Sequence, residues 1–112
     1  MKIKNTPKGI ILLILAMSSS AFAEIGSVKI LSPKDGSIVR DTLKMDYDVI
    51  PGPSGDHVHM YADGKEVDVI KKLKGQYTFK KLSSGKRELC IKIVDKGHTP
   101  IGVEKCIHVV VE

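Results

Sequence analysis

The feature that most constrains this chain is the alternation of apolar and polar residues in short segments separated by turn formers. From Leu43 to Val49 an apolar side chain occupies every second position, and Lys or Asp fills the positions between them. Side chains on a strand point alternately to its two faces, so this pattern predicts a half-buried β-strand. No stretch of residues 24–112 has a sustained helical period. An all-β fold follows.

Further strands are expected where apolar residues cluster between turns such as Asp63-Gly64 and Ser83-Ser84-Gly85. The expected segments are approximately 28–31, 38–39, 57–62, 65–70, 77–79, 89–93 and 103–111. About seven short strands in a chain of this length predict an immunoglobulin-like or fibronectin-type antiparallel β-sandwich.

The N-terminal residues 1–23 have the three parts of a cleaved secretory signal peptide. Three lysines precede an apolar run from Gly9 to Met17, and Ala21-Phe22-Ala23 follows as a small-residue cleavage site. The apolar run is far shorter than the roughly 20 residues that span a bilayer. We therefore expect a periplasmic protein without a transmembrane segment in the mature chain.

Removal of 23 residues from the 112 leaves 89, which suits one domain over residues 24–112, and we expect a monomer. Three of the 18 basic residues leave with the signal, so the net charge falls from +5 to +2. The basic residues between the strands lack the repeated aromatic residues that stack nucleic-acid bases. We interpret them as a solvated face and expect no nucleic-acid partner. These residues are Lys71, Lys72, Lys74, Lys80 and Lys81.

The two cysteines, Cys90 and Cys106, favour a structural disulfide, because an exported domain of this size has a small core and an oxidising environment. The alternatives, a thiol metal site or a redox pair, have no Cys-x-x-Cys spacing to support them. Facing residues in a hairpin have numbers with a constant sum. A Cys90–Cys106 pair therefore centres the turn on His98 and sets Glu88 opposite His108.

His57, His59 and His98 are the candidate site residues. His57 and His59 alternate on one strand, so both side chains point to the same face of a sheet. In an immunoglobulin-like sandwich the third strand runs antiparallel to the sixth, which places the start of the third beside the loop that follows the sixth. We therefore expect His98 to meet the pair.

Three imidazoles suit copper or zinc, with Asp56 or Asp95 available to orient a ring or to supply an oxygen. Met60 has the opposite parity and is expected in the core. The alternative interpretation is that the two strand histidines are polar residues on an outer sheet face and that His98 is an ordinary turn residue.

An enzyme is not expected, because the chain has no nucleophile-elbow serine, no phosphate-binding glycine loop and no metalloprotease helix. We expect a periplasmic binding protein that holds copper or zinc. The competing hypothesis is a non-catalytic envelope interaction module with a protein or glycan partner and no metal. A metal hydrolase ranks third.

Several motifs in order resemble a family of small exported bacterial domains of unknown function with an immunoglobulin-like fold. They are Ser32-Pro33-Lys34-Asp35-Gly36, His57-Val58-His59, Leu82-Ser83-Ser84-Gly85-Lys86 and Asp95-Lys96-Gly97-His98-Thr99-Pro100. The resemblance covers nearly all of the mature chain, and the family pattern includes the paired histidines and the turn histidine, which match His57, His59 and His98.

The chain also departs from this family. Asp56 and Arg87 stand where the family often has histidine, the segment after the hairpin is shorter, and Cys90 and Cys106 are not family features. The resemblance therefore implies the fold and a cluster with fewer histidines than the family often has, but it implies no activity.

Overall fold

The computed structural model describes residues 25–112, so the predicted signal peptide at residues 1–23 lies outside the described part. The described residues form eight strands, where about seven were expected, and the brief segment at 38–39 is a strand of its own. The strands are β1 (Ser27–Ser32), β2 (Ile38–Val39), β3 (Leu43–Ile50), β4 (His57–Ala62), β5 (Lys65–Ile70), β6 (Lys74–Phe79), β7 (Gly85–Val94) and β8 (Pro100–Val111). Residues 25–112 contain no helix with the length and hydrophobicity of a membrane span.

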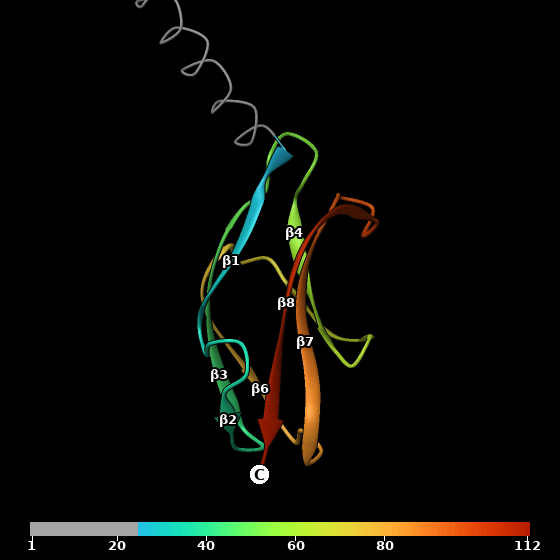
Figure 1. The fold of residues 1–112 in the computed structure, drawn as a ribbon. Helices are drawn as coiled ribbons and strands as arrows, with labels where there is room; N and C mark the ends of the chain where they lie inside the picture. The colour runs from blue at the N-terminus through green and yellow to red at the C-terminus, as the bar shows by residue number, and fades with distance from the viewer. Residues whose placement is uncertain (1–24) are drawn as a thin grey trace, which may run out of the picture.

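The strands form two sheets that face each other as a sandwich (Figure 1). One sheet has the order β1-β3-β6, and the other has the order β2-β8-β7-β4-β5. The longer strands pair antiparallel with their neighbours, whereas the two-residue β2 pairs parallel with the end of β8. The predicted immunoglobulin-like β-sandwich is confirmed.

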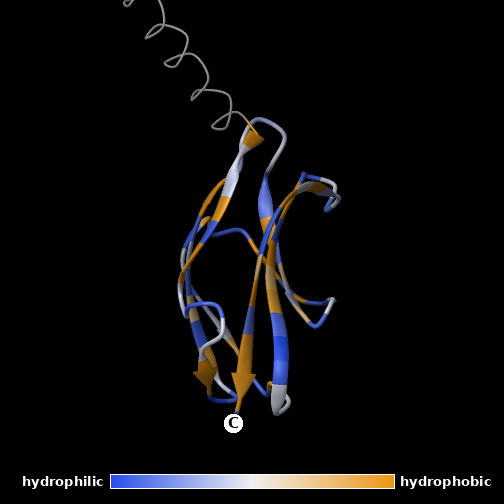
Figure 2. Ribbon diagram, in the orientation of Figure 1, coloured by the Kyte–Doolittle hydropathy of each residue, from blue (hydrophilic) through white to orange (hydrophobic). Residues whose placement is uncertain are grey.

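The core lies between the sheets and takes every second residue of the central strands. Met45 and Tyr47 enter it from β3, and Met60, Leu89 and Ile91 enter it from β4 and β7, all at most 1% exposed. The Tyr47 hydroxyl donates a hydrogen bond of 2.6 Å to the carbonyl of Lys72, which satisfies the polar end of this buried ring. Hydrophobic and hydrophilic residues accordingly intermix along the strands in Figure 2.

β4 is a central strand, with β5 on one side and β7 on the other. The predicted hairpin to β5 turns at Asp63-Gly64, where both residues have positive φ, 51° and 79°. Val58 and Met60 are fully buried in the core, which confirms the predicted parity of Met60. The alternate positions, His57 and His59, therefore point to the other face of the sheet.

The β7–β8 hairpin has the predicted register. Cys90 pairs with Cys106 and forms the disulfide, and Glu88 pairs with His108. A bulge between Lys92 and Val94 shifts the pairing near the tip, and the tip curls away from the line of the two strands in Figure 1. Cys90 lies outside the core cluster but is only 4% exposed, so the disulfide is less exposed than an outward-facing pair would be.

We predict that replacing both Cys90 and Cys106 with alanine lowers the free energy of unfolding by about 3 kcal/mol. The disulfide closes a loop with a sequence separation of 16, and its loss frees that loop in the unfolded chain. The melting temperature should fall by more than about 10 °C, measured by circular dichroism. Unchanged melting would contradict a stabilising disulfide.

Candidate functional site

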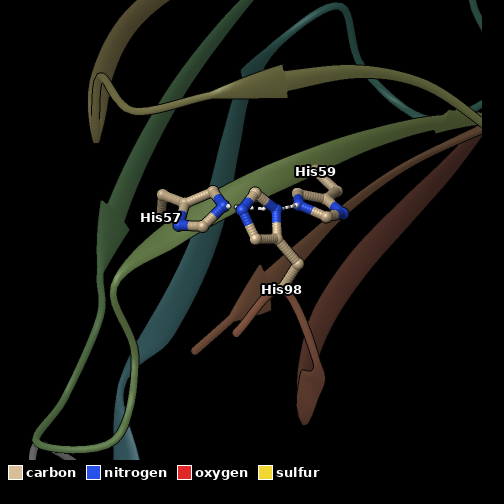
Figure 3. Close-up of side chains that lie close together, drawn as sticks. All are labelled: His57, His59 and His98. Atoms are coloured by element: carbon tan, nitrogen blue, oxygen red, sulfur yellow. Dashed lines mark hydrogen bonds between the residues drawn. The ribbon is translucent and has the colours of Figure 1, made fainter. Parts of the chain in front are cut away.

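The structure brings the three predicted histidines together over β4. His57 and His59 extend from the strand, and His98 reaches between them from the tip of the β7–β8 hairpin (Figure 3). Nε2 of His57 lies 3.3 Å from Nδ1 of His98, and Nε2 of His59 lies 3.1 Å from the same atom. One ring nitrogen from each residue lies within 4.8 Å of the other two, as predicted from the register.

The pairing of β4 with β7 explains this convergence. His57 pairs with Val94 near the end of β7, so the start of β4 lies beside the hairpin tip. In the tip, the backbone NH of His98 donates to the Asp95 carbonyl over 2.9 Å. The φ of His98 is +68°, a left-handed conformation in which histidine is one of the more frequent residues. This turn directs the imidazole back over β4.

The strand histidines are less exposed than residues on an uncovered outer face of a sheet. His57 and His59 are 2% and 3% exposed, whereas His98 is exposed. Val94, which pairs with His57 on the same side of the sheet, is also fully buried. The curled hairpin tip therefore covers this face, so His57 and His59 lie on an outer sheet face, as the alternative interpretation placed them, but are buried there.

Each strand histidine has a carboxylate at the nitrogen that points away from the cluster. Nδ1 of His57 lies 2.9 Å from Oδ2 of Asp56, and Nδ1 of His59 lies 3.0 Å from Oε1 of Glu66. The hydrogen bond from His57 lowers the pKa of the Asp56 carboxyl below its ordinary value. Asp56 accepts a hydrogen bond from His57, so in the neutral ring the hydrogen lies on Nδ1 and the Nε2 lone pair points into the cluster. The Glu66 carboxylate favours the same arrangement in the His59 ring.

The two aspartates predicted to support the site have different roles. Asp56 orients a ring, as expected, whereas Oδ1 of Asp95 accepts a 2.9 Å hydrogen bond from the Thr99 backbone NH and so shapes the turn. The sequence reasoning missed Glu66. The Asp63-Gly64 hairpin could have indicated it, because Glu66 pairs with Tyr61, which shares a strand face with His59.

The remaining candidate ligands lie elsewhere, as predicted. Met60 is in the core, and His108 lies 3.4 Å from Glu88 and 3.6 Å from Asp35 on the exposed side of the hairpin. Glu88 also lies close to the two cysteine sulfurs, but these sulfurs are joined in the disulfide and supply no thiolate.

Two of the three spacings between the histidine nitrogens match those of ligands around one small cation, and all three lie within 4.8 Å. Two imidazole nitrogens bound at about 2.0–2.1 Å to a tetrahedral metal are about 3.3 Å apart. The distances of 3.3 and 3.1 Å are close to this value. The arrangement is therefore chemically able to offer three neutral nitrogen donors to one ion.

No protein-family model matches this chain, and no curated protein matches it. Solved structures do resemble its fold. Fibronectin(III)-like modules of Clostridium thermocellum CbhA share 17% identity over 78% of this chain and 46% of that chain, with a TM-score of 0.61. The present chain thus spans about half the length of that structure.

Two further similarities have lower scores. The CARDB domain of a Pyrococcus furiosus protein, solved in complex with di-metal ions, shares 16% identity over 78% of this chain and 87% of that chain, with a TM-score of 0.53. A Jonesia denitrificans lytic polysaccharide monooxygenase shares 14% identity over 72% of this chain and 61% of that chain, with a TM-score of 0.52. At these identities the likeness concerns the fold alone. The chain has an immunoglobulin-like β-sandwich fold that is similar to fibronectin(III)-like modules.

We predict that, in the presence of a chelator, His59→Ala destabilises the domain more than His98→Asn. The alanine leaves a cavity at a buried position and removes the partner of Glu66, at a cost of about 1–3 kcal/mol. His98 is exposed and asparagine tolerates its positive φ, so its replacement leaves no buried cavity. It removes only the hydrogen that the two Nε2 atoms share, and its cost should be smaller, about 1 kcal/mol. Urea denaturation measures both, and equal losses would contradict the assigned burial.

Proposed function

We propose that this domain is a periplasmic metal-binding protein that holds copper or zinc through His57, His59 and His98. The observation that carries the proposal is the convergence of three ring nitrogens, in which Nε2 of His57 and Nε2 of His59 lie 3.3 and 3.1 Å from Nδ1 of His98. The predicted signal peptide and the disulfide support an oxidising, exported location.

The count of hydrogens within the cluster favours a cation. With Nδ1 of His57 and Nδ1 of His59 directed at carboxylates, both Nε2 atoms are acceptors, and both face the single Nδ1 of His98. One hydrogen on that atom cannot make two full hydrogen bonds. A metal ion would accept all three lone pairs at once.

The donor set favours copper(II) or zinc over harder or softer ions. Imidazole nitrogens suit these metals, whereas calcium and magnesium prefer oxygen, and copper(I) favours sulfur ligands. Asp56 and Glu66 would then act from outside the metal's ligands by orienting two of the rings. Three protein ligands leave a further position for water or another donor.

A binding role, rather than catalysis, is part of the proposal. Grooves of about 870 and 480 Å³ on the domain are lined by other residues and do not include the three histidines. Storage, transfer or sensing of the metal are the uses that such a site supports. A metal-free interaction module is the competing function, and it requires that no stoichiometric metal binds.

We predict that the mature domain binds about one equivalent of copper(II) or zinc, measured by isothermal titration calorimetry. His57→Ala and His98→Asn should each weaken binding by about 100-fold or more, because each removes a metal ligand. His108→Ala is the matched control and should leave the affinity unchanged. A metal affinity in the triple variant, which lacks all three site histidines, equal to that of the unmodified domain would overturn the proposal.

The two carboxylates offer a subtler test. We predict that Glu66→Gln and Asp56→Asn each weaken metal binding by about 10- to 100-fold while leaving one equivalent bound, because each ring loses the acceptor that fixes its orientation. Glu104→Gln, a carboxylate on β8, is the control. Competition titration with a chromogenic chelator gives the affinities, and no change in either variant would remove the carboxylates from the site.

A further inference from the structure

β5 is a free edge of the larger sheet. It pairs with β4 on one side and has no strand on its other side within residues 25–112. Its side chains are largely exposed, including Val67 at 46% and Val69 at 37%. A free edge offers unpaired backbone NH and carbonyl groups to which another strand can add.

A groove of about 870 Å³ opens between β5 and β6, at the side of the sandwich where each sheet ends. Val67, Tyr77, Phe79 and Leu82 supply its apolar lining. The Tyr77 and Phe79 rings meet edge to face with centroids 4.8 Å apart, and Phe79 is 3% exposed. The rings thus pack on each other instead of offering a flat face to a sugar, and the lining suits aliphatic side chains.

Positive charge surrounds this lining. Lys65, Lys80 and Lys81 line the groove, are exposed and form no ion pair among the described residues. The groove also contains two carboxylates, but both are engaged. Asp63 lies 2.9 Å from Arg87, and Asp68 is a neighbour of Tyr77, whose pKa is raised to about 12 by burial and by this carboxylate.

We propose that this groove binds an extended, acidic segment of another polypeptide, which adds as a strand to the free edge of β5. Side chains of an added strand alternate, so its apolar residues would enter the groove while its acidic residues meet the three lysines. β5 has six residues, which matches a strand of usual length. This proposal is independent of the metal site.

The charges of β5 favour a different polypeptide over a second copy of this chain. A second β5 would bring Lys65 to the groove with two acidic residues, but these carboxylates already lie against His59 and Tyr77. The chain that follows β5 adds lysines at 71, 72 and 74. Repulsion among these lysines opposes self-pairing, which is how edge strands commonly avoid it. An acidic strand instead neutralises the free charge around the groove.

The test uses a blocked octapeptide of alternating glutamate and valine as the probe, and one of alternating lysine and valine as its counterpart. We expect the glutamate peptide to shift the backbone amide signals of β5 and β6 in nitrogen-15 NMR spectra of the metal-free domain. Added salt should weaken the binding. Cross-strand contacts between peptide and β5 protons should appear in nuclear Overhauser spectra.

The double variant Lys80→Glu/Lys81→Glu should weaken peptide binding by about tenfold or more through charge reversal. Lys34→Glu/Lys105→Glu makes the same change in net charge away from the groove and should leave binding unchanged. Equal binding of both peptides, shifts located outside β5 and β6, or β5 shifts that follow the concentration of the domain alone would overturn the proposal. The last result would instead identify a second copy as the occupant.

Discussion

The antiparallel pairing of β4 with β7 is the constraint on which the rest of this domain depends. It buries Val58 and Met60 between the sheets and directs His57 and His59 to the other face. It also sets the start of β4 beside the tip that carries His98, although His98 is 41 residues from His57 and 39 from His59 in sequence. Core packing and the candidate site therefore rest on the same ladder of backbone hydrogen bonds.

The histidine cluster lowers the free energy of unfolding by an amount that matters for a domain of this size. Each buried polar group without a full hydrogen bond costs about 1–3 kcal/mol, and a small domain has a net stability of only about 5–15 kcal/mol. Asp56 and Glu66 offset part of this cost at the outer nitrogens, but the inner nitrogens share one hydrogen. The disulfide joins the two strands of the hairpin that carries His98, so it stabilises the element that completes the cluster.

Immunoglobulin-like sandwiches serve many unrelated functions, so the particular surfaces must carry any functional argument. Here β5 contributes to two of them. Glu66 contacts His59, whereas Val67 lines the groove beside β6. A bulge between Met60 and Tyr61 separates these roles, because a regular continuation of the hairpin would set Asp68 opposite His59. The bulge places Val69 there instead and leaves Asp68 beside Tyr77.

The sequence by itself determined the strands, the Asp63-Gly64 turn, the core position of Met60 and the pairing of Cys90 with Cys106. These follow from side-chain alternation and turn chemistry, which are local, and from one covalent pair that sets a register. Only the tertiary structure decided that His57 and His59 are buried and that Glu66 meets His59. Both depend on bulges and on the curvature of the hairpin, which arise from the summed twist of several strands and have no signature in a two-residue period.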